Sequence, residues 1–134
     1  AFVAILFILN GRKESPESIP AASSSPASVI SPTEIPTILQ TYEILINNSG
    51  LSTQALNLKT GDTVKFINND STPHWPASGP HPTHTTCSGF DALRGLTQGE
   101  SYSFTFTVAK TCPFHDHLNA FDSNYKGTIN VSGQ

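Results

Sequence analysis

The chain has 134 residues, of which 37% are hydrophobic and 13% are charged, so it is long enough for about one domain and too short for a multidomain enzyme. The charged fraction is about half of the roughly 25% usual in soluble domains, whereas ten prolines and nine glycines supply many turns, which favours a β protein. A net charge of -3 provides no basic surface to neutralise phosphates, so we expect no nucleic-acid partner.

Residues 1–9 (AFVAILFIL) form an uninterrupted apolar run, and residues 10–13 then switch to polar and basic side chains. This run is far shorter than the roughly 20 residues that a membrane-spanning helix needs. We interpret residues 1–11 as a signal peptide or membrane anchor that is cut short at its start, with a buried strand as the alternative. The protein is then expected to be periplasmic or otherwise extracytoplasmic, secreted or membrane-tethered, and to touch the membrane only through this segment.

Residues 12–40 are rich in proline and serine and contain no apolar run dense enough for a strand. Prolines recur every four to six residues in this stretch, at Pro16, Pro20, Pro26, Pro32 and Pro36. Because proline removes a backbone donor and favours extended polyproline conformations, this segment is predicted to be a stiff, disordered tether. The folded domain is therefore expected to span residues 41–134.

Several segments of the expected domain alternate apolar and polar side chains or are rich in β-forming residues, as short strands do. They are residues 42–46, 54–59, 63–68, 101–106 and 127–131. Turn residues separate them, and this spacing indicates a small β-sandwich or barrel. Residues 69–96 lack such a period and are rich in proline, histidine and glycine, which predicts a long functional loop.

All five histidines of the chain lie in two stretches: His74, His81 and His84 in the long loop, and His115 and His117 before the last predicted strand. This clustering indicates a metal site, because a metal needs imidazoles that converge from separate segments. His115 and His117 stand at i and i+2, so their side chains point to one face if the backbone is extended. Each histidine taken alone is also compatible with a surface or capping role. The two cysteines are compatible with one disulfide, with one metal thiolate and a spectator, or with two spectators.

Residues 59–70 (KTGDTVKFINND), with His74 four residues further on, resemble the segment before the first copper-binding histidine of plastocyanin-like and amicyanin-like cupredoxins. Residues 90–91, 96–99, 101–107 and 126–129 continue the pattern, so the resemblance covers nearly all of residues 41–131. It implies an all-β fold, a cupredoxin-like Greek-key β-sandwich or barrel of about eight strands preceded by the disordered tether. It also implies a metal site at one end of the barrel, between the loop after His74 and the loop before the last strand.

In the family that the chain resembles, a blue-copper site consists of one histidine and a later loop that carries a cysteine, a second histidine and an axial methionine. The chain has no methionine, but Cys112 and His115 have the Cys-x-x-His spacing, and Leu118 stands at the axial position. One ligand set that the resemblance implies is therefore a type 1 copper site with a vacant axial position. Its ligands would be His74, Cys112 and His115, with His117 as the alternative to His115.

The register of the family's final hairpin implies a different site. In that register Cys112 takes the place of an upstream strand residue, Asp116 stands where the copper thiolate would be, and Asn119 stands where the next ligand histidine would be. Cys112 is then free to pair with Cys87, as expected for two cysteines of an exported protein. Such a bridge would contribute about 3 kcal/mol by closing a loop of about 25 residues, and would tie the histidine-rich loop to the hairpin.

The chain also resembles a subset of bacterial cupredoxin-like domains whose ligand loop carries no cysteine. The matching pieces are residues 74–78 (HWPAS), 81–84 (HPTH) and 115–118 (HDHL). This resemblance implies an imidazole-dominated metal site formed by His74, His81, His84, His115 and His117. Copper, as Cu²⁺ or Cu⁺, is the first expected metal and zinc the second, because Cu(II) forms more stable complexes with a given set of nitrogen ligands. Asp116 is expected to ligate weakly or to orient a histidine, and Trp75 to serve as a lid or core residue.

Three functions are compatible with these features. We expect an exported, monomeric copper-binding protein that either transfers electrons to a redox partner protein or sequesters copper. The first alternative is a small copper-dependent redox enzyme, which needs a coordination position open to substrate. The second alternative is a β-sandwich without metal that serves in adhesion or as a structural module.

Overall fold

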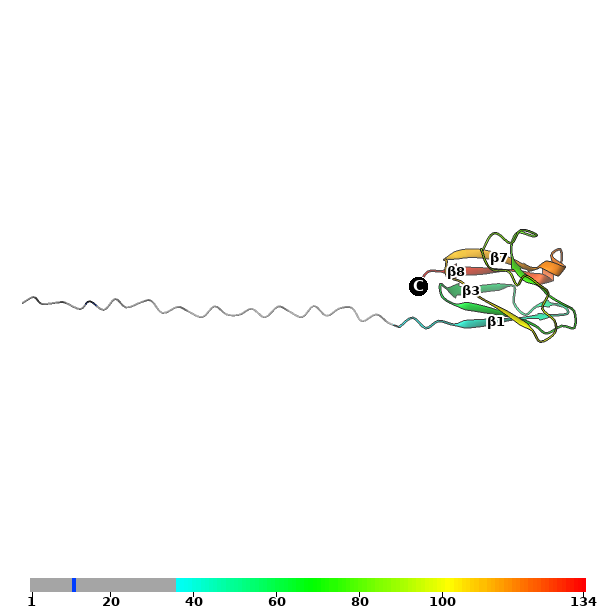
Figure 1. Cartoon of the computed structure of the whole chain (residues 1–134), viewed down its shortest axis with the longest axis horizontal. Coiled ribbons are helices and arrows are strands. Elements are labelled where there is room, and N and C mark those ends of the chain that lie inside the picture. The colour runs from blue at the N-terminus through cyan, green and yellow to red at the C-terminus, as the bar shows by residue number, and fades with distance from the viewer. Residues whose placement is uncertain (1–10, 12–35) are drawn as a thin grey trace, which may run out of the picture. The chain divides into compact units, whose positions relative to one another are not determined.

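The computed structural model describes Gly11 and residues 36–134 (Figure 1). Nearly all of the predicted leader and most of the predicted tether therefore lie outside the described residues. Residues 36–40, at the end of the predicted tether, are exposed and have no regular secondary structure. Within the described residues, no helix combines the length and the apolar character that crossing a membrane requires.

Residues 36–134 form two four-stranded sheets that lie as two layers (Figure 1). The first sheet has the order β2-β1-β4-β6 and the second has the order β3-β8-β7-β5. The strands are β1 (Thr41–Asn47), β2 (Gly50–Leu51), β3 (Ala55–Lys59), β4 (Thr63–Asn68), β5 (Pro76–Ser78), β6 (Ser101–Thr105), β7 (Lys110–Asp116) and β8 (Lys126–Ser132). Two short 3-10 helices, η1 (His117–Asn119) and η2 (Ser123–Tyr125), lie between β7 and β8. The expected all-β sandwich is thereby confirmed.

The period-two alternation of side chains places the strands in these layers. In β4, Val64, Phe66 and Asn68 are buried, whereas the residues between them are only partly buried. The parallel pair of β1 and β4 aligns Ile44 with Phe66, so two buried apolar side chains lie side by side. Each strand predicted from the sequence is present, and its ends differ from the predicted ones by no more than one residue.

Aromatic rings fill the space between the two sheets. The ring centroids of Phe66 and Phe90 are 5.5 Å apart, and those of Phe66 and Phe114 are 5.4 Å apart. Such aromatic pairs contribute about 0.5–1.5 kcal/mol beyond the burial of their area. Because Phe114 belongs to β7, this core fixes the strand that carries His115.

The structure corrects the prediction of a continuous loop over residues 69–96. Residues 76–78 form β5, which pairs antiparallel with β7 and aligns Ala77 with His115. All three residues of β5 are buried, and the strand begins with Pro76, so the sequence carries no alternation that would reveal it. Because β5 pairs with β7, it brings the histidine-rich loop next to the strand that carries His115.

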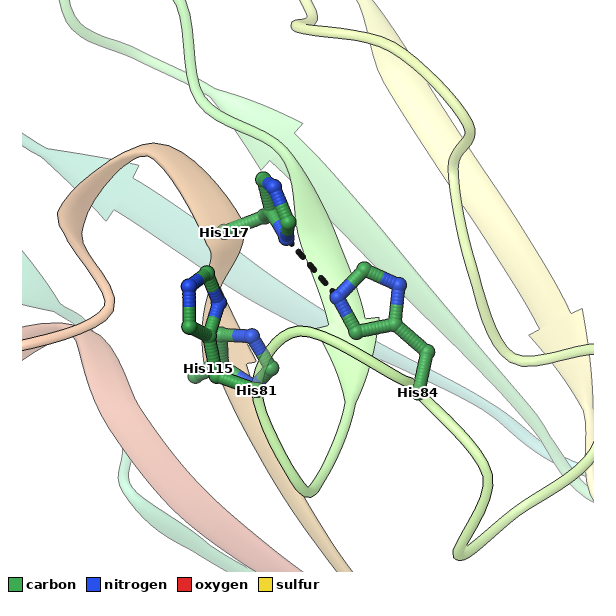
Figure 2. Close-up of side chains that lie close together, drawn as sticks. All are labelled: His81, His84, His115 and His117. Carbon is green, nitrogen blue, oxygen red and sulfur yellow. Dashed lines mark hydrogen bonds between the residues drawn. The ribbon is translucent and has the colours of Figure 1, made fainter.

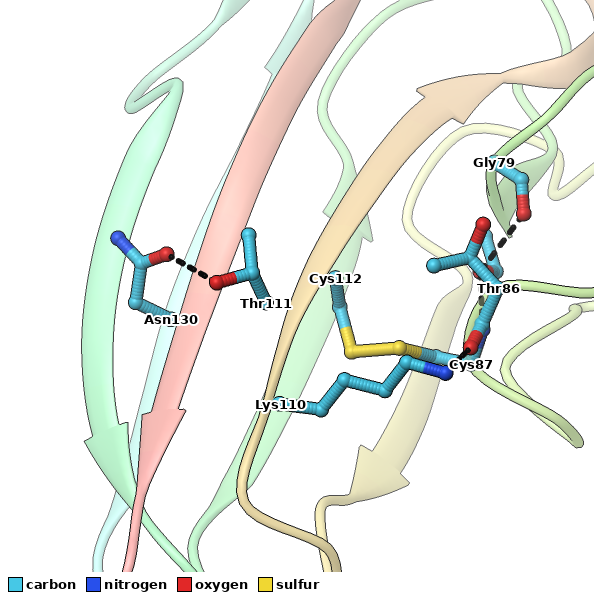
Figure 3. Close-up of a disulfide and its surroundings, with 8 residues drawn as sticks. Gly79, Thr86, Cys87, Lys110, Thr111, Cys112 and Asn130 are labelled. Atoms are coloured by element: carbon cyan, nitrogen blue, oxygen red, sulfur yellow. Dashed lines mark hydrogen bonds between the residues drawn. A yellow bond between two sulfur atoms is a disulfide. The ribbon is translucent and has the colours of Figure 1, made fainter.

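Cys87 and Cys112 form a disulfide, as the hairpin register implies, and their Cα atoms are 5.8 Å apart (Figure 3). The loop side is further held by two hydrogen bonds: the Cys87 N–H donates to Ser78 Oγ at 2.8 Å, and Lys110 Nζ donates to the Thr86 carbonyl at 2.6 Å. The bridge therefore joins the histidine-rich loop to β7. Since the Cys112 sulfur is bonded to Cys87, it offers no thiolate, and the type 1 ligand set does not fit this structure.

Candidate metal centre

Four histidines converge beside the end of β7 (Figure 2). One ring nitrogen from each lies within 4.8 Å of those of the other three. We call this group the four-histidine cluster; its members are His81, His84, His115 and His117. His115 is buried, His84 and His117 are partly buried, and His81 is exposed, so the cluster is closed on one side and reaches solvent on the other.

The alternation of side chains at the end of β7 sends neighbouring residues to opposite sides. His115 and Asp116 end this strand, and His117 begins η1. The rings of His115 and His117 both face the cluster, with centroids 6.2 Å apart, whereas Asp116 contacts His74 at 2.6 Å. The backbone N–H of His117 donates to the Trp75 carbonyl at 2.7 Å, which fixes the start of η1.

Backbone hydrogen bonds hold the loop with His81 and His84 in a closed turn against β7. The Gly79 N–H donates to the Pro113 carbonyl at 2.7 Å, and the His84 N–H donates to the Pro80 carbonyl at 2.9 Å. His84 has a φ of 51°, in the left-handed region that costs a non-glycine residue about 1–3 kcal/mol. Such a conformation persists only where surrounding contacts require it, and here those contacts hold the imidazole of His84.

His115 is the most deeply buried member of the cluster and is 5% exposed. Within the described residues, its Nε2 is buried and has no hydrogen-bond partner. Burial first, and then the neighbouring imidazoles of His84, His81 and His117, lower the pKa of His115 to about 4. The ring is therefore neutral near pH 7, and its nitrogen lone pair is available to an ion. A buried polar atom without a partner costs about 1–3 kcal/mol, which a bound cation would relieve.

Asp91 supports the cluster, a role that was not predicted for it from the sequence. Its Oδ2 lies 2.6 Å from His84 Nδ1, and its Oδ1 accepts a hydrogen bond of 2.6 Å from Trp75 Nε1. On the other side of its ring, His84 Nε2 lies 2.8 Å from His117 Nδ1. Burial raises the pKa of Asp91, but hydrogen bonds from Trp75, the Leu93 backbone and His84 outweigh it, so the pKa is lowered overall. The sequence signals for Asp91 are its acidic side chain within the histidine-rich loop and its place in the family pattern at residues 90–91.

Two aromatic side chains cover the cluster. Trp75 is partly buried and lies against His117, with ring centroids 4.3 Å apart. Phe121 is 92% exposed, and its ring centroid lies 5.9 Å from that of His81. Trp75 thus lies as a lid over one imidazole of the cluster rather than serving as a core residue.

His74 lies outside the four-histidine cluster, although the sequence predicts it as a metal ligand. Its Nδ1 is 2.6 Å from Asp116 Oδ2, and its Nε2 is 3.1 Å from Asp70 Oδ2. The ring also stacks on Tyr125, with centroids 5.1 Å apart. Both ring nitrogens of His74 therefore face carboxylate oxygens. Asp116 was expected either to ligate a metal weakly or to orient a histidine. In this structure it orients His74.

Solved structures of known proteins share this fold. An oxidized mutant of amicyanin is 28% identical, with a TM-score of 0.55 over 69% of this chain and 82% of that chain. A Cu(I) form of another amicyanin mutant is 29% identical, also with a TM-score of 0.55 over 69% and 82% of the two chains. The purple cupredoxin from Nitrosopumilus maritimus is 21% identical, with a TM-score of 0.57 over 68% of this chain and 99% of that chain. The sequence matches no protein-family model and no curated protein sequence. The described domain is a cupredoxin-like domain.

Of the three positions that the resemblance and its hairpin register assign to copper ligands, the cupredoxin-like domain keeps the first histidine and departs from the family at the other two. The three positions hold His74, Asp116 and Asn119, and they contact one another. Asn119 Nδ2 donates to Asp116 Oδ2 at 2.6 Å and lies 3.5 Å from His74 Nδ1. A carboxylate and an amide thus complete a hydrogen-bonded group around His74, without any sulfur atom.

Copper, the metal that the cupredoxin family implies, fits the four-histidine cluster. Neutral imidazoles are ligands that suit Cu(II) and Zn(II). The buried Nε2 of His115 supplies a nitrogen with no competing hydrogen bond among the described residues. Asp91 gives His84 the carboxylate partner that metal-binding histidines commonly have. The cluster would therefore hold the ion, and the group around His74 would support the fold beside it.

Proposed function

We propose that this cupredoxin-like domain binds one copper ion in the four-histidine cluster and thereby carries or sequesters copper outside the cytoplasm. One observation carries the proposal: four imidazole nitrogens lie within 4.8 Å of one another. They come from two separate parts of the chain, and converging imidazole nitrogens are the ligands that a Cu(II) or Zn(II) site needs. Cu(II) binds a given set of nitrogen ligands more tightly than Zn(II), so copper is the proposed metal and zinc the second choice.

The donor set favours copper binding over rapid electron transfer. Blue-copper electron-transfer sites use a cysteine thiolate and a weak axial ligand, usually methionine. Here both cysteines belong to the disulfide, and the chain has no methionine. His81 is exposed, so an ion has a route between the cluster and solvent.

Trp75 provides an internal probe of this proposal. It is the only tryptophan of the chain, and its ring lies 4.3 Å from that of His117. Cu(II) added to the metal-free protein at pH 7 is therefore expected to quench tryptophan fluorescence until one equivalent is bound. His115→Ala should weaken binding by more than about tenfold, because it removes a buried ligand. His74→Asn, outside the cluster, should change the affinity by less than about threefold.

Equilibrium dialysis gives the stoichiometry and the decisive negative result. Failure of the wild-type protein to take up stoichiometric Cu(II) or Zn(II) at pH 7 would contradict the proposal. Loss of binding in a folded His74→Asn variant, with normal binding in His115→Ala, would move the site to His74. Circular dichroism of each variant establishes that it is folded before binding is measured.

The colour of the copper-loaded protein tests the ligand atoms. An imidazole-only site lacks the thiolate that gives blue copper its intense charge-transfer band, so the Cu(II) protein should be pale. Electron paramagnetic resonance should show nitrogen hyperfine coupling from the imidazoles. An intense visible band that disappears in Cys112→Ser would contradict both the disulfide and the histidine-only ligand set.

Electron transfer is the second candidate function. It is favoured by the likeness to amicyanin mutants whose structures are of oxidized and reduced forms. In this case we expect a redox partner protein. Cyclic voltammetry of the copper-loaded domain should then give a reversible Cu(II)/Cu(I) wave that His115→Ala removes. An irreversible response would favour copper carriage.

We also propose that the protein is exported, with residues 1–11 as the targeting or anchoring segment and residues 12–40 as a tether. The disulfide supports this proposal, because such bonds persist mainly in oxidising compartments. Cell fractionation of the full-length protein, combined with thiol alkylation, should find oxidised protein outside the cytoplasm. A reduced protein confined to the cytoplasm would contradict it.

A further inference from the structure

Asp91 lies outside the four-histidine cluster but is held rigidly beside it. Its side chain is 19% exposed, and its Oδ1 accepts the backbone N–H of Leu93 at 2.8 Å in addition to the Trp75 indole. The backbone N–H of Asp91 donates to the Tyr102 hydroxyl at 3.0 Å. Both carboxylate oxygens are therefore committed to defined partners, and the group cannot rotate freely.

The contact with Asp91 determines which nitrogen of His84 carries the proton. An ionised carboxylate only accepts hydrogen bonds, so the 2.6 Å contact places the proton on His84 Nδ1. The lone pair is then on His84 Nε2. This atom faces the cluster, because it lies 2.8 Å from His117 Nδ1. In the metal-free domain His84 Nε2 accepts a hydrogen bond from His117 Nδ1, so its lone pair points into the cluster and can pass to a metal that displaces this bond.

The same carboxylate also positions a second member of the cluster. Its Oδ1 accepts the Trp75 indole N–H at 2.6 Å, and the Trp75 ring lies against His117 with centroids 4.3 Å apart. One residue thus acts on His84 directly and on His117 through Trp75. Two of the four imidazoles depend on it.

We propose that Asp91 is a positioning residue for the metal site: it fixes the Nδ1–H tautomer of His84 and braces Trp75 over His117. This inference rests on the proposed copper-binding function. Carboxylate partners of metal-binding histidines typically account for about 10- to 100-fold in metal affinity. Asp91 is seven residues from His84 in an irregular loop, so only the folded structure makes this assignment.

The test compares Asp91→Asn with a matched control. The asparagine oxygen can accept from only one of the two side-chain donors, His84 Nδ1–H and Trp75 Nε1–H. If the asparagine NH₂ faces His84, it favours the tautomer with the proton on Nε2, and that proton blocks metal binding by Nε2. We expect Asp91→Asn to bind Cu(II) and Zn(II) about 10- to 100-fold more weakly in chelator competition. Asp122→Asn removes the same charge at the N-cap of η2, where asparagine caps equally well, and should change affinity by less than about twofold.

A second measurement, of the His84 tautomer, needs no metal. Nitrogen-15 NMR of the metal-free wild-type protein at neutral pH should find the proton of His84 on Nδ1. Asp91→Asn should shift this tautomer toward Nε2–H. Trp75→Phe keeps a ring over His117 but removes the indole donor, so its affinity should fall by less than that of Asp91→Asn.

The outcomes separate this inference from the proposed function. If the wild-type protein binds neither Cu(II) nor Zn(II), the proposed function fails, and the positioning role fails with it. If the wild-type protein binds copper but Asp91→Asn binds it as tightly as Asp122→Asn, only the role of Asp91 is overturned. A wild-type His84 protonated on Nε2 also overturns that role, whether or not Asp91→Asn folds.

Discussion

The buried imidazole of His115 makes the stability of the metal-free domain depend on pH. Burial, followed by its histidine neighbours, lowers the pKa of His115 from its ordinary value of 6.5 to about 4. Between these values the unfolded chain binds more protons than the folded domain, so stability is expected to fall as the pH falls from about 6.5 to about 4. Urea unfolding of the metal-free protein at pH 7, 5.5 and 4 measures this loss.

A comparison with His115→Gln isolates the contribution of this residue. Glutamine does not titrate, so the free energy of unfolding of the variant should fall less steeply over the same pH range. Part of the slope remains, because burial and then His84 lower the pKa of His117 as well. Equal slopes for the two proteins would contradict the neutral, buried state of His115.

At the scale of elements, the disulfide joins the two segments that carry the cluster. Replacing both Cys87 and Cys112 by alanine is expected to lower the free energy of unfolding by about 3 kcal/mol, because the closed loop of 25 residues is released. Copper affinity should also fall, since the loop with His84 is less restrained. Urea unfolding and Trp75 quenching measure the two effects. Unchanged affinity with reduced stability would contradict the role of the disulfide in the site and would show that the β5–β7 pairing and the loop hydrogen bonds hold the histidines without it.

Strand β8 lies close to its neighbours at Gly127. A Cβ at this position would lie 2.6 Å from the Gln54 carbonyl oxygen and 2.6 Å from the Phe114 ring. Gly127→Ala is therefore expected to lower the free energy of unfolding by about 1–3 kcal/mol and, by moving β7, to weaken copper binding. Gly133→Ala, where a Cβ meets no atom within 4 Å, should change stability by less than about 0.5 kcal/mol. Chemical denaturation of the two variants measures this difference in the free energy of unfolding. Equal stabilities of Gly127→Ala and Gly133→Ala would contradict the close approach at Gly127.

At the scale of the whole domain, copper should stabilise the native state, because only the folded chain brings the four imidazoles together. A ligand at 100 times its Kd adds about 2.7 kcal/mol, and each kcal/mol raises the Tm of a domain of this size by about 4–8 °C. Scanning calorimetry should therefore show an increase of about 10–20 °C for the wild-type protein with Cu(II). His115→Gln should show a much smaller increase. No increase at a copper concentration that fills the site would contradict selective binding to the folded domain.

Strand positions were predictable from this sequence wherever one face of a strand is buried and the other is not. In β4 the apolar residues Val64 and Phe66 alternate with polar residues in the sequence, and this alternation matches the burial pattern of the strand. Strand β5 was missed because all three of its residues are buried and the first is Pro76. The shared face of His115 and His117 follows from local backbone geometry. The contact between His74 and Asp116 could not be predicted in this way. It depends on how the end of β7 packs against the segment with His74, which only the folded chain determines.

By itself, the sequence determined the β-sandwich, the strands with clear alternation and the enrichment of imidazoles in two segments, because these properties depend on local composition and period. Only the tertiary structure decided which imidazoles meet. His84 contacts His117 at a sequence separation of 33 residues, and Asp116 contacts His74 at a separation of 42 residues. Both contacts therefore depend on the path of an irregular loop. That path is set by the β5–β7 pairing and by the disulfide, which act together only once the chain has folded.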